Sequence, residues 1–217
     1  MLGLTLAPEA VGARRVLAIG CHPDDIEIGC GGTLLALSRA QPGLEVTWVV
    51  LSAHGARADE ARSSAAAFLA AAGAADVRLF DHPDAFMPHV AAAVKETFET
   101  LKELEPDLVL THAGADLHQD HRLASELTWQ TFRDHLILEF EIPKYDGDRG
   151  SPNVFVPLSD EIVDEKLTLM GEHHASQTTK HWFDEELFRG LLRLRGMESA
   201  TRYAESFFAK KLTLLPG

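Results

Sequence analysis

The sequence predicts an α/β fold, built as one domain around a mainly parallel sheet with helices on both faces. Short apolar segments alternate with longer helical patterns along most of the chain, which is typical of parallel sheets. At 217 residues, 46% of them hydrophobic, the chain can bury a single substantial core. Polar clusters follow two of the apolar segments, and the carboxyl ends of parallel strands are where active sites collect in such folds.

The first half of the chain alternates predicted strands and helices. Its strands are short apolar runs, and its helices show either alanine-rich composition or apolar residues three to four apart. The predicted strands are residues 16–20, 44–51, 76–80 and 106–112. The predicted helices are residues 33–40, 58–72 and 90–104.

The pattern weakens after residue 134. A helix is predicted from about residue 120 to residue 129. Beyond it, the predicted strands are residues 136–142 and 154–156, the predicted helices are residues 160–173 and 184–194, and residues 207–215 form a last strand or an extended tail. Without an internal repeat, a linker or a domain boundary, we expect one Rossmann-like domain over residues 1–217.

The first polar cluster, Cys-His-Pro-Asp-Asp-Ile-Glu at residues 21–27, directly follows the first predicted strand. Imidazole nitrogen and carboxylate oxygen are donors that zinc accepts. His22 and Asp25 are close enough to hold one ion, which leaves Asp24 free as a base. The alternative is a polar turn that caps the following helix.

The second polar cluster lies 99 residues further on, after the strand predicted at residues 106–112. His118 and His121 are three residues apart at the start of a predicted helix, so both can face one cavity. Two such clusters at neighbouring strand ends predict a three-ligand zinc site with an open position for water, as in catalytic zinc sites.

These motifs resemble a known family. His-Pro-Asp-Asp-Ile-Glu at 22–27, Gly-Cys-Gly-Gly-Thr-Leu at 29–34 and Asp-Leu-His-Gln-Asp-His at 116–121 are similar to the LmbE-like, or PIG-L, N-deacetylases. That superfamily includes deacetylases of N-acetylglucosaminyl phosphatidylinositol and of mycothiol and bacillithiol precursors. Weaker similarity continues at Arg57, at residues 174–177 and at residues 203–207, so the resemblance covers most of the chain.

The resemblance implies a metal site held by His22, Asp25 and His121. The implied metal is zinc, with iron(II) as the alternative. Arg57 either binds a hydroxyl or carboxylate of the substrate or is a solvated residue before a helix.

The resemblance also implies catalytic roles. Asp24 is the general base, His118 stabilises the oxyanion or protonates the amine, and Asp120 orients His118. A carboxylate in that position should raise the pKa of the histidine. Some family members carry a tyrosine where this chain has Asp116, so a tyrosine-assisted oxyanion hole does not carry over.

The predicted function is hydrolysis of the N-acetyl group of an amino sugar or a GlcNAc-containing small molecule. One alternative is an amidase of the same fold that cleaves a larger acyl group or a thiol conjugate. A more distant alternative is a non-catalytic sugar-binding or metal-binding protein, which would have no use for the spare carboxylate of Asp24.

Composition excludes several other classes. A net charge of −13 argues against a nucleic-acid partner, and no apolar run reaches the roughly 18 to 20 residues of a membrane span. Residues 1–12 lack a signal-peptide pattern, so a cytoplasmic location is expected. The glycines at 29–32 lack the spacing of a dinucleotide-binding loop. The oligomeric state, including a homo-oligomer, stays open.

The remaining candidates have simpler explanations. Cys21 and Cys30 are expected to pack in the interior, with a metal-ligand role as the minor alternative. Glu27 is expected to support its loop. His174 belongs to the similarity at residues 174–177, and a polar helix end is its simpler explanation. The other histidines lack a partner at ligand spacing, although His112 lies nearest the site; they are His54, His82, His89, His112, His135, His173 and His181.

Overall fold

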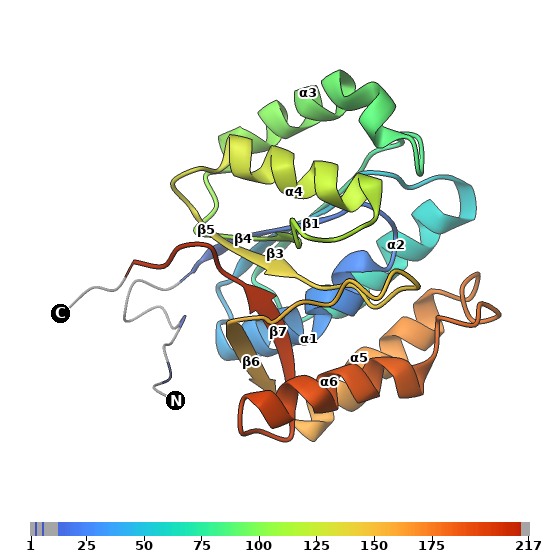
Figure 1. Ribbon diagram of the computed structural model, residues 1–217. Coiled ribbons are helices and arrows are strands. Elements are labelled where there is room, and N and C mark those ends of the chain that lie inside the picture. The colour runs from blue at the N-terminus through green and yellow to red at the C-terminus, as the bar shows by residue number, and fades with distance from the viewer. Residues whose placement is uncertain (1–2, 4–5, 7–12, 214–217) are drawn as a thin grey trace.

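The computed structural model describes residues 3, 6 and 13–213 (Figure 1). These residues contain one seven-stranded sheet in the order β3-β2-β1-β4-β5-β7-β6. The strands are β1 (Arg15–Gly20), β2 (Glu45–Val50), β3 (Ala74–Leu79), β4 (Leu108–His112), β5 (Leu136–Phe140), β6 (Val154–Leu158) and β7 (Tyr203–Phe208). The α-helices are α1 (Asp25–Ala40), α2 (Gly55–Phe68), α3 (Ala91–Leu101), α4 (Gln119–Thr131), α5 (Asp160–His173) and α6 (Glu185–Glu198).

The sheet is mainly parallel, as predicted. β1 pairs in parallel with β2 on one side and β4 on the other, and β2–β3 and β4–β5 are also parallel. Only β7 runs against its neighbours, β5 and β6. The chain proceeds outward from β1 to β3 and then returns to the opposite side of β1 as β4, so the strand order reverses between these two central strands. Open α/β sheets bind ligands at such a reversal.

Helices cover both faces of the sheet, again as predicted (Figure 1). Side chains alternate between the two faces along each strand. In β1, Leu17 and Ile19 join the core beneath α3 and α4, which also contains Phe98. Val16 and Ala18 of the same strand join the larger core beneath α1, α2, α5 and α6. The central strands are therefore buried on both faces, which explains their continuous apolar sequence.

Helix α1 begins eight residues earlier than the segment predicted at 33–40, so the glycines at 29–32 lie inside the helix. A Cβ atom on Gly29 would lie 2.3 Å from the ring of Phe140, and one on Gly31 would lie 2.7 Å from the ring of Phe68. Close packing from both sides therefore requires glycine and outweighs its poor helix propensity. As a result, α1 starts at Asp25, inside the predicted metal motif.

A buried ion pair anchors the middle of α1. Nζ of Lys166 donates to Oε1 of Glu205 at 2.6 Å and to the carbonyl of Ile28 at 2.7 Å. The same carboxylate accepts the backbone amides of Gly32 and Thr33 at 2.8 and 2.7 Å. Glu205 belongs to β7, and its charge interrupts the apolar run by which a buried strand is recognised in a sequence. The last strand is therefore Tyr203–Phe208, and the segment predicted at 207–215 was placed too late.

Two sequence predictions concern the ends of the chain. Those about residues 1–12 and 214–215 fall largely outside the residues that the structure describes. Within the described part, no helix combines the length and the apolar character needed to cross a bilayer.

Candidate active site

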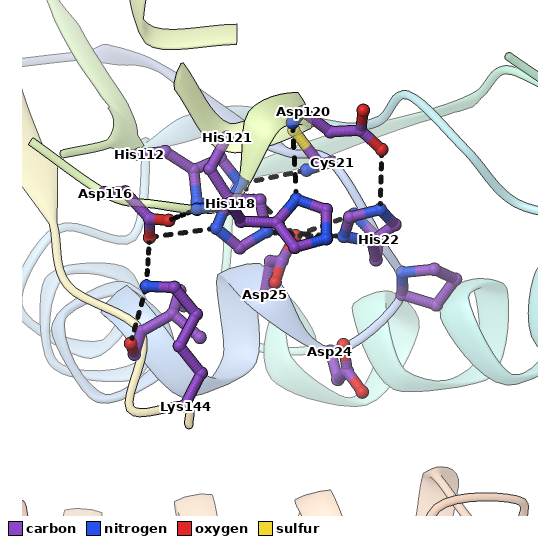
Figure 2. Close-up of polar contacts among 12 residues, drawn as sticks. Cys21, His22, Asp24, Asp25, His112, Asp116, His118, Asp120, His121 and Lys144 are labelled. Atoms are coloured by element: carbon purple, nitrogen blue, oxygen red, sulfur yellow. Dashed lines mark hydrogen bonds and ion pairs between the residues drawn. The ribbon is translucent and has the colours of Figure 1, made fainter. Parts of the chain in front are cut away.

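The turn after β1 places a histidine and two aspartates at the carboxyl edge of the sheet (Figure 2). The amide of His22 donates to Oδ2 of Asp25 at 2.7 Å, which closes the turn at the first residue of α1. Asp24 has a left-handed backbone, with φ 117° and ψ −22°, which side-chain-bearing residues rarely adopt. Figure 2 shows the consequence: Asp25 lies among the histidines, whereas Asp24 lies apart from them.

The segment after β4 supplies the facing half of the site. His112 is the last residue of β4, and α4 begins with His118 as its N-cap. Nδ1 of His118 accepts the amide of Asp120 at 3.3 Å, so the neutral ring carries its proton on Nε2. His121 lies in the first turn of α4 and is buried.

The three ligands named from the sequence come together at one point. Nδ1 of His22 lies 3.4 Å from Oδ2 of Asp25, and Nε2 of His121 lies 3.5 Å from the same oxygen. The two ring nitrogens are 3.3 Å apart. Donor atoms about 2.0–2.1 Å from a tetrahedral zinc ion are separated by about 3.3–3.4 Å. The three side chains therefore fit an ion of this size and geometry.

A second, overlapping donor set lies deeper. Cys21, Asp25, His112 and His121 each offer one ligand atom, and these atoms lie within 4.8 Å of one another. Nε2 of His112 is 3.2 Å from Oδ2 of Asp25, and its ring stacks on that of His121 at 3.8 Å. Cys21 and His112 do not line the cavity at the site, whereas His22 does. Of the two sets, the one containing His22 is the set that a substrate can reach.

His22, Asp25 and His121 form a donor triangle, and each of its two histidines has a carboxylate behind it. Oδ2 of Asp116 lies 3.0 Å from Nδ1 of His121, and Oδ2 of Asp120 lies 3.3 Å from Nε2 of His22. In both rings the other nitrogen is the one that belongs to the donor triangle. Carboxylates in this position fix the tautomer and orientation of metal-bound histidines.

The position of Asp120 differs from the sequence prediction, which paired its side chain with His118. Its carboxylate accepts the amides of Ala85 and Met87 at 2.8 and 3.2 Å and lies against His22. His118 is instead held through the backbone amide of Asp120. The carboxylate thus orients a ligand of the proposed site, and only the main chain of Asp120 orients His118.

The electrostatics favour Asp24 as a proton acceptor near neutral pH. Burial raises the pKa of Asp24 to about 7, with Arg57 acting in the opposite direction and Asp25 adding to the increase. A general base is most effective when its pKa lies near the working pH.

The histidines have lowered pKa values. Burial and the neighbouring His22 lower the pKa of His118, and they outweigh the opposing effect of Asp120. Asp120 does act to raise this pKa, as predicted, but the pKa of His118 in the metal-free protein still lies below its ordinary value. Burial and then His112 lower the pKa of His121 to about 4, so the ring is neutral at neutral pH, as a metal ligand must be.

Arg57 connects Asp24, through Glu60, to the loop that contains Ser176. Its Nη2 donates to Oδ2 of Asp24 at 3.0 Å and to the carbonyl of Pro23, which supports the left-handed turn. Its Nη1 lies 3.4 Å from Oε2 of Glu60, whose carboxylate accepts the amide and hydroxyl of Ser176 at 2.8 and 2.7 Å. Arg57 also lines the cavity, so it is not a solvated surface residue.

A cavity of about 530 Å³ opens over the donor triangle. Its wall includes the donor triangle, Asp24 and Arg57. Residues of the segments 142–145 and 177–182 also line it. Such a volume is within the range of small-molecule sites. Its polar and charged lining residues are His22, Asp24, Asp25, Ser52, His54, Arg57, Asp84, His118, His121, Lys144, Tyr145, Gln177 and Lys180.

Residues 17–132, more than half of the chain and both histidine-aspartate clusters, match the family described as PIG-L, GlcNAc-PI de-N-acetylase. The chain belongs to the PIG-L family. This confirms the resemblance seen in the sequence motifs.

Relatives of this PIG-L chain are distant. "Uncharacterized deacetylase YaiS" of Escherichia coli (strain K12) is 28% identical over 185 residues, which cover 80% of this chain and 97% of that protein. Diacetylchitobiose deacetylase of Thermococcus kodakarensis is 26% identical over 224 residues, covering 88% and 81%. The structure of 4-carboxy-2-hydroxymuconate hydratase from Pseudomonas putida KT2440 superposes with a TM-score of 0.74 at 18% identity, covering 94% and 99%. The last comparison shows the fold alone.

Three residues of the PIG-L site had no assigned role in the sequence analysis. Lys144 lies 2.8 Å from Oδ2 of Asp116, and Oδ1 of Asp84 lies 3.1 Å from Nε2 of His22. His112 was noted only for its position at a strand end. No local spacing marks Lys144 or Asp84, because each reaches the site from a separate loop.

The remaining candidates occupy supporting positions. Nε2 of His174, the C-cap of α5, is 3.0 Å from Oε1 of Glu27, and both side chains are buried. Glu27 thus supports the motif, as expected. Cys30 is buried in the main core and belongs to neither donor set.

Proposed function

We propose that this protein is a metal-dependent hydrolase that removes the N-acetyl group of an amino sugar or a GlcNAc-containing small molecule. The observation that carries this proposal is the carboxylate of Asp24. It is buried at the cavity wall, its pKa is raised to about 7, and it stands outside the donor triangle. A site that only stored a metal or bound a sugar would have no use for such a group.

The proposed metal is zinc, with iron(II) as the alternative, held by His22, Asp25 and His121. When bound, such an ion supplies Lewis acidity, which lowers the pKa of water from about 15.7 to about 7 and polarises an amide carbonyl. Asp116 and Asp120 keep the two ligand rings oriented. In the deeper donor set, Cys21 and His112 do not line the cavity.

The side chains around the triangle provide the proton transfers. Asp24 accepts a proton from the attacking water and returns it to the departing amine. Arg57 holds the carboxylate of Asp24 in place at 3.0 Å. His118, with its proton on Nε2, donates a hydrogen bond to the oxygen that becomes negatively charged. A neutral donor suits the lowered pKa of His118.

Residues 1–217 form one deacetylase domain in this proposal, and the substrate is a small N-acetylated sugar or glycoconjugate. Support comes from membership of the PIG-L family and from the diacetylchitobiose deacetylase among its relatives. An amidase that cleaves a larger acyl group would use every residue named above and would differ only in how its substrate fills the cavity.

The test is acetate release from N-acetylglucosamine and its β-1,4-linked disaccharide, with and without a chelator. We expect acetate release that the chelator abolishes and that added zinc or iron(II) restores. His121→Ala should lose most bound metal and activity, whereas His89→Ala, an exposed residue outside the cavity, should keep both. Binding of these sugars without acetate release, or release only from substrates with longer acyl chains, would contradict the proposal.

A further inference from the structure

A second cavity of about 440 Å³ adjoins the one over the donor triangle. The two cavities share four lining residues, Pro143, Lys144, Tyr145 and Trp182. The second cavity extends away from the triangle toward the start of α6, where Asp184 and Leu187 line it. A molecule held at the donor triangle can therefore extend past these shared residues into further space.

Two aromatic side chains stand where the cavities meet. Trp182 lines both, and its ring is held edge-on by Phe183 at 5.6 Å. Tyr145 also lines both and is 79% exposed, more than any other large hydrophobic side chain of the described residues. Flat amphipathic rings of this kind offer an apolar face to a ligand at little conformational cost. Trp182 packs against Phe183, whereas Tyr145 is exposed.

Basic side chains also line both cavities. Arg149 in the second cavity and Lys180 in the first have no carboxylate partner among the described residues, although the chain carries 33 acidic and 20 basic residues. Lys144, in contrast, is paired with Asp116 and Asp148 at 2.8 and 2.6 Å. Within the part of the chain that the structure describes, Asp184 is the one acidic residue in the lining of the second cavity.

The carboxylate of Asp184 is already engaged. Its Oδ1 accepts the amide of Leu187 at 2.9 Å as the N-cap of α6. His181 also lines the second cavity. With Lys144 neutralised by its own partners, the guanidinium of Arg149 is the charge that a ligand in this cavity can pair with.

We infer that the second cavity is a subsite for the aglycone of the substrate, and that this aglycone carries a planar or apolar portion followed by an anionic group. The apolar portion packs on Trp182 and Tyr145, and a carboxylate or phosphate pairs with Arg149. This inference rests on the proposed function, because the sugar is placed at the donor triangle. It adds a class of substrate: acidic glycoconjugates in preference to neutral sugars.

The experiment compares three aryl glycosides of N-acetylglucosamine that differ only at the far end of the ring. They are the phenyl, 4-carboxyphenyl and 4-phosphonophenyl β-glycosides. Binding is measured by calorimetry in metal-loaded Asp24→Asn, so that affinity is read without turnover. Wild-type kcat/KM for acetate release is measured in parallel. Arg149→Gln removes the charge, and Arg62→Gln, an exposed arginine of α2 outside both cavities, is the matched control.

We expect the carboxyphenyl glycoside to bind about 3- to 5-fold more tightly than the phenyl glycoside at low salt, the range for an exposed ion pair. Arg149→Gln should remove that preference and leave phenyl binding unchanged, and Arg62→Gln should change neither. A larger gain for the phosphonate identifies phosphate as the natural group, and a larger gain for the carboxylate identifies an acidic organic aglycone.

Two results separate this inference from the proposed function. Equal affinity for the charged and neutral glycosides, or a preference that survives Arg149→Gln, overturns the anionic subsite even if acetate is released. Absence of acetate release, combined with an Arg149-dependent preference in binding, overturns the deacetylase function and leaves the subsite supported.

Discussion

Replacing Asp24, the proposed base, with asparagine should raise the free energy of unfolding of the metal-free protein. The same replacement should abolish most of the activity of the metal-loaded protein. Asp24 is 4% exposed, and burial raises its pKa from 3.8 to about 7. Asp24→Asn removes the buried charge but keeps the size of the side chain. Asparagine also tolerates a positive φ better than most residues, so the left-handed turn at φ 117° should persist. Arg57 keeps a partner in Glu60.

The stability effect depends on pH. Below pH 3.8 the carboxyl group of Asp24 is protonated in both the folded and the unfolded chain, so it contributes nothing. As the pH rises toward 7, the unfolded chain ionises first and the free energy of unfolding falls. Above pH 7 the full penalty applies, on the order of 4 kcal/mol for a pKa raised from 3.8 to about 7. Asp24→Asn should recover much of this amount at pH 8 and little of it at pH 4.

The assay is urea denaturation of chelator-treated wild type and Asp24→Asn between pH 4 and pH 8.5, with acetate release measured on the metal-loaded proteins. Asp59→Asn, an exposed residue of α2, controls for the change of side chain. We expect a stability difference that grows with pH and a loss of activity of about 10²- to 10⁴-fold. A difference that is constant with pH, or a variant less stable than wild type at pH 8, would refute the reasoning about burial. Wild-type turnover would refute the role as base.

Two further predictions follow from the contacts. Asp120→Asn should lower metal affinity by about 10- to 100-fold, because the carboxylate of Asp120 orients His22. Competition with a chelator measures this affinity. Asp84→Asn should have a smaller effect, because the carboxylate of Asp84 approaches the same nitrogen of His22 but is mostly exposed. Unchanged metal affinity in Asp120→Asn would show that the carboxylate of Asp120 does not orient His22 for metal binding. Lys166→Met should lower the free energy of unfolding by about 3–5 kcal/mol, because it leaves the carboxylate of Glu205 buried without its cation. Urea denaturation measures this change, and a loss below about 1 kcal/mol would mean that the two backbone amides alone satisfy Glu205.

Much of the fold could be predicted from the sequence because it depends on local periodicity. Continuous apolar runs reveal strands buried on both faces, and apolar residues three to four apart reveal amphipathic helices. The predictions failed where packing outweighed local preference. The helix predicted at residues 33–40 left out the glycines at 29–32, yet these lie inside α1, where Phe140 and Phe68 pack closely against Gly29 and Gly31. The charge of Glu205 concealed β7, because its partner Lys166 lies 39 residues away.

The sequence by itself determined which residue types stand at the two strand ends, because parallel strands bring their carboxyl ends to one edge. That was enough to predict that the two polar clusters meet, and the family resemblance then implied His22, Asp25 and His121 as the metal ligands. Only the tertiary structure decided which carboxylate serves which histidine: Asp120 turns to His22, 98 residues away, and not to its near neighbour His118. The partner of a buried polar group is set by the packing of distant elements, and no pattern of neighbours along the chain records it.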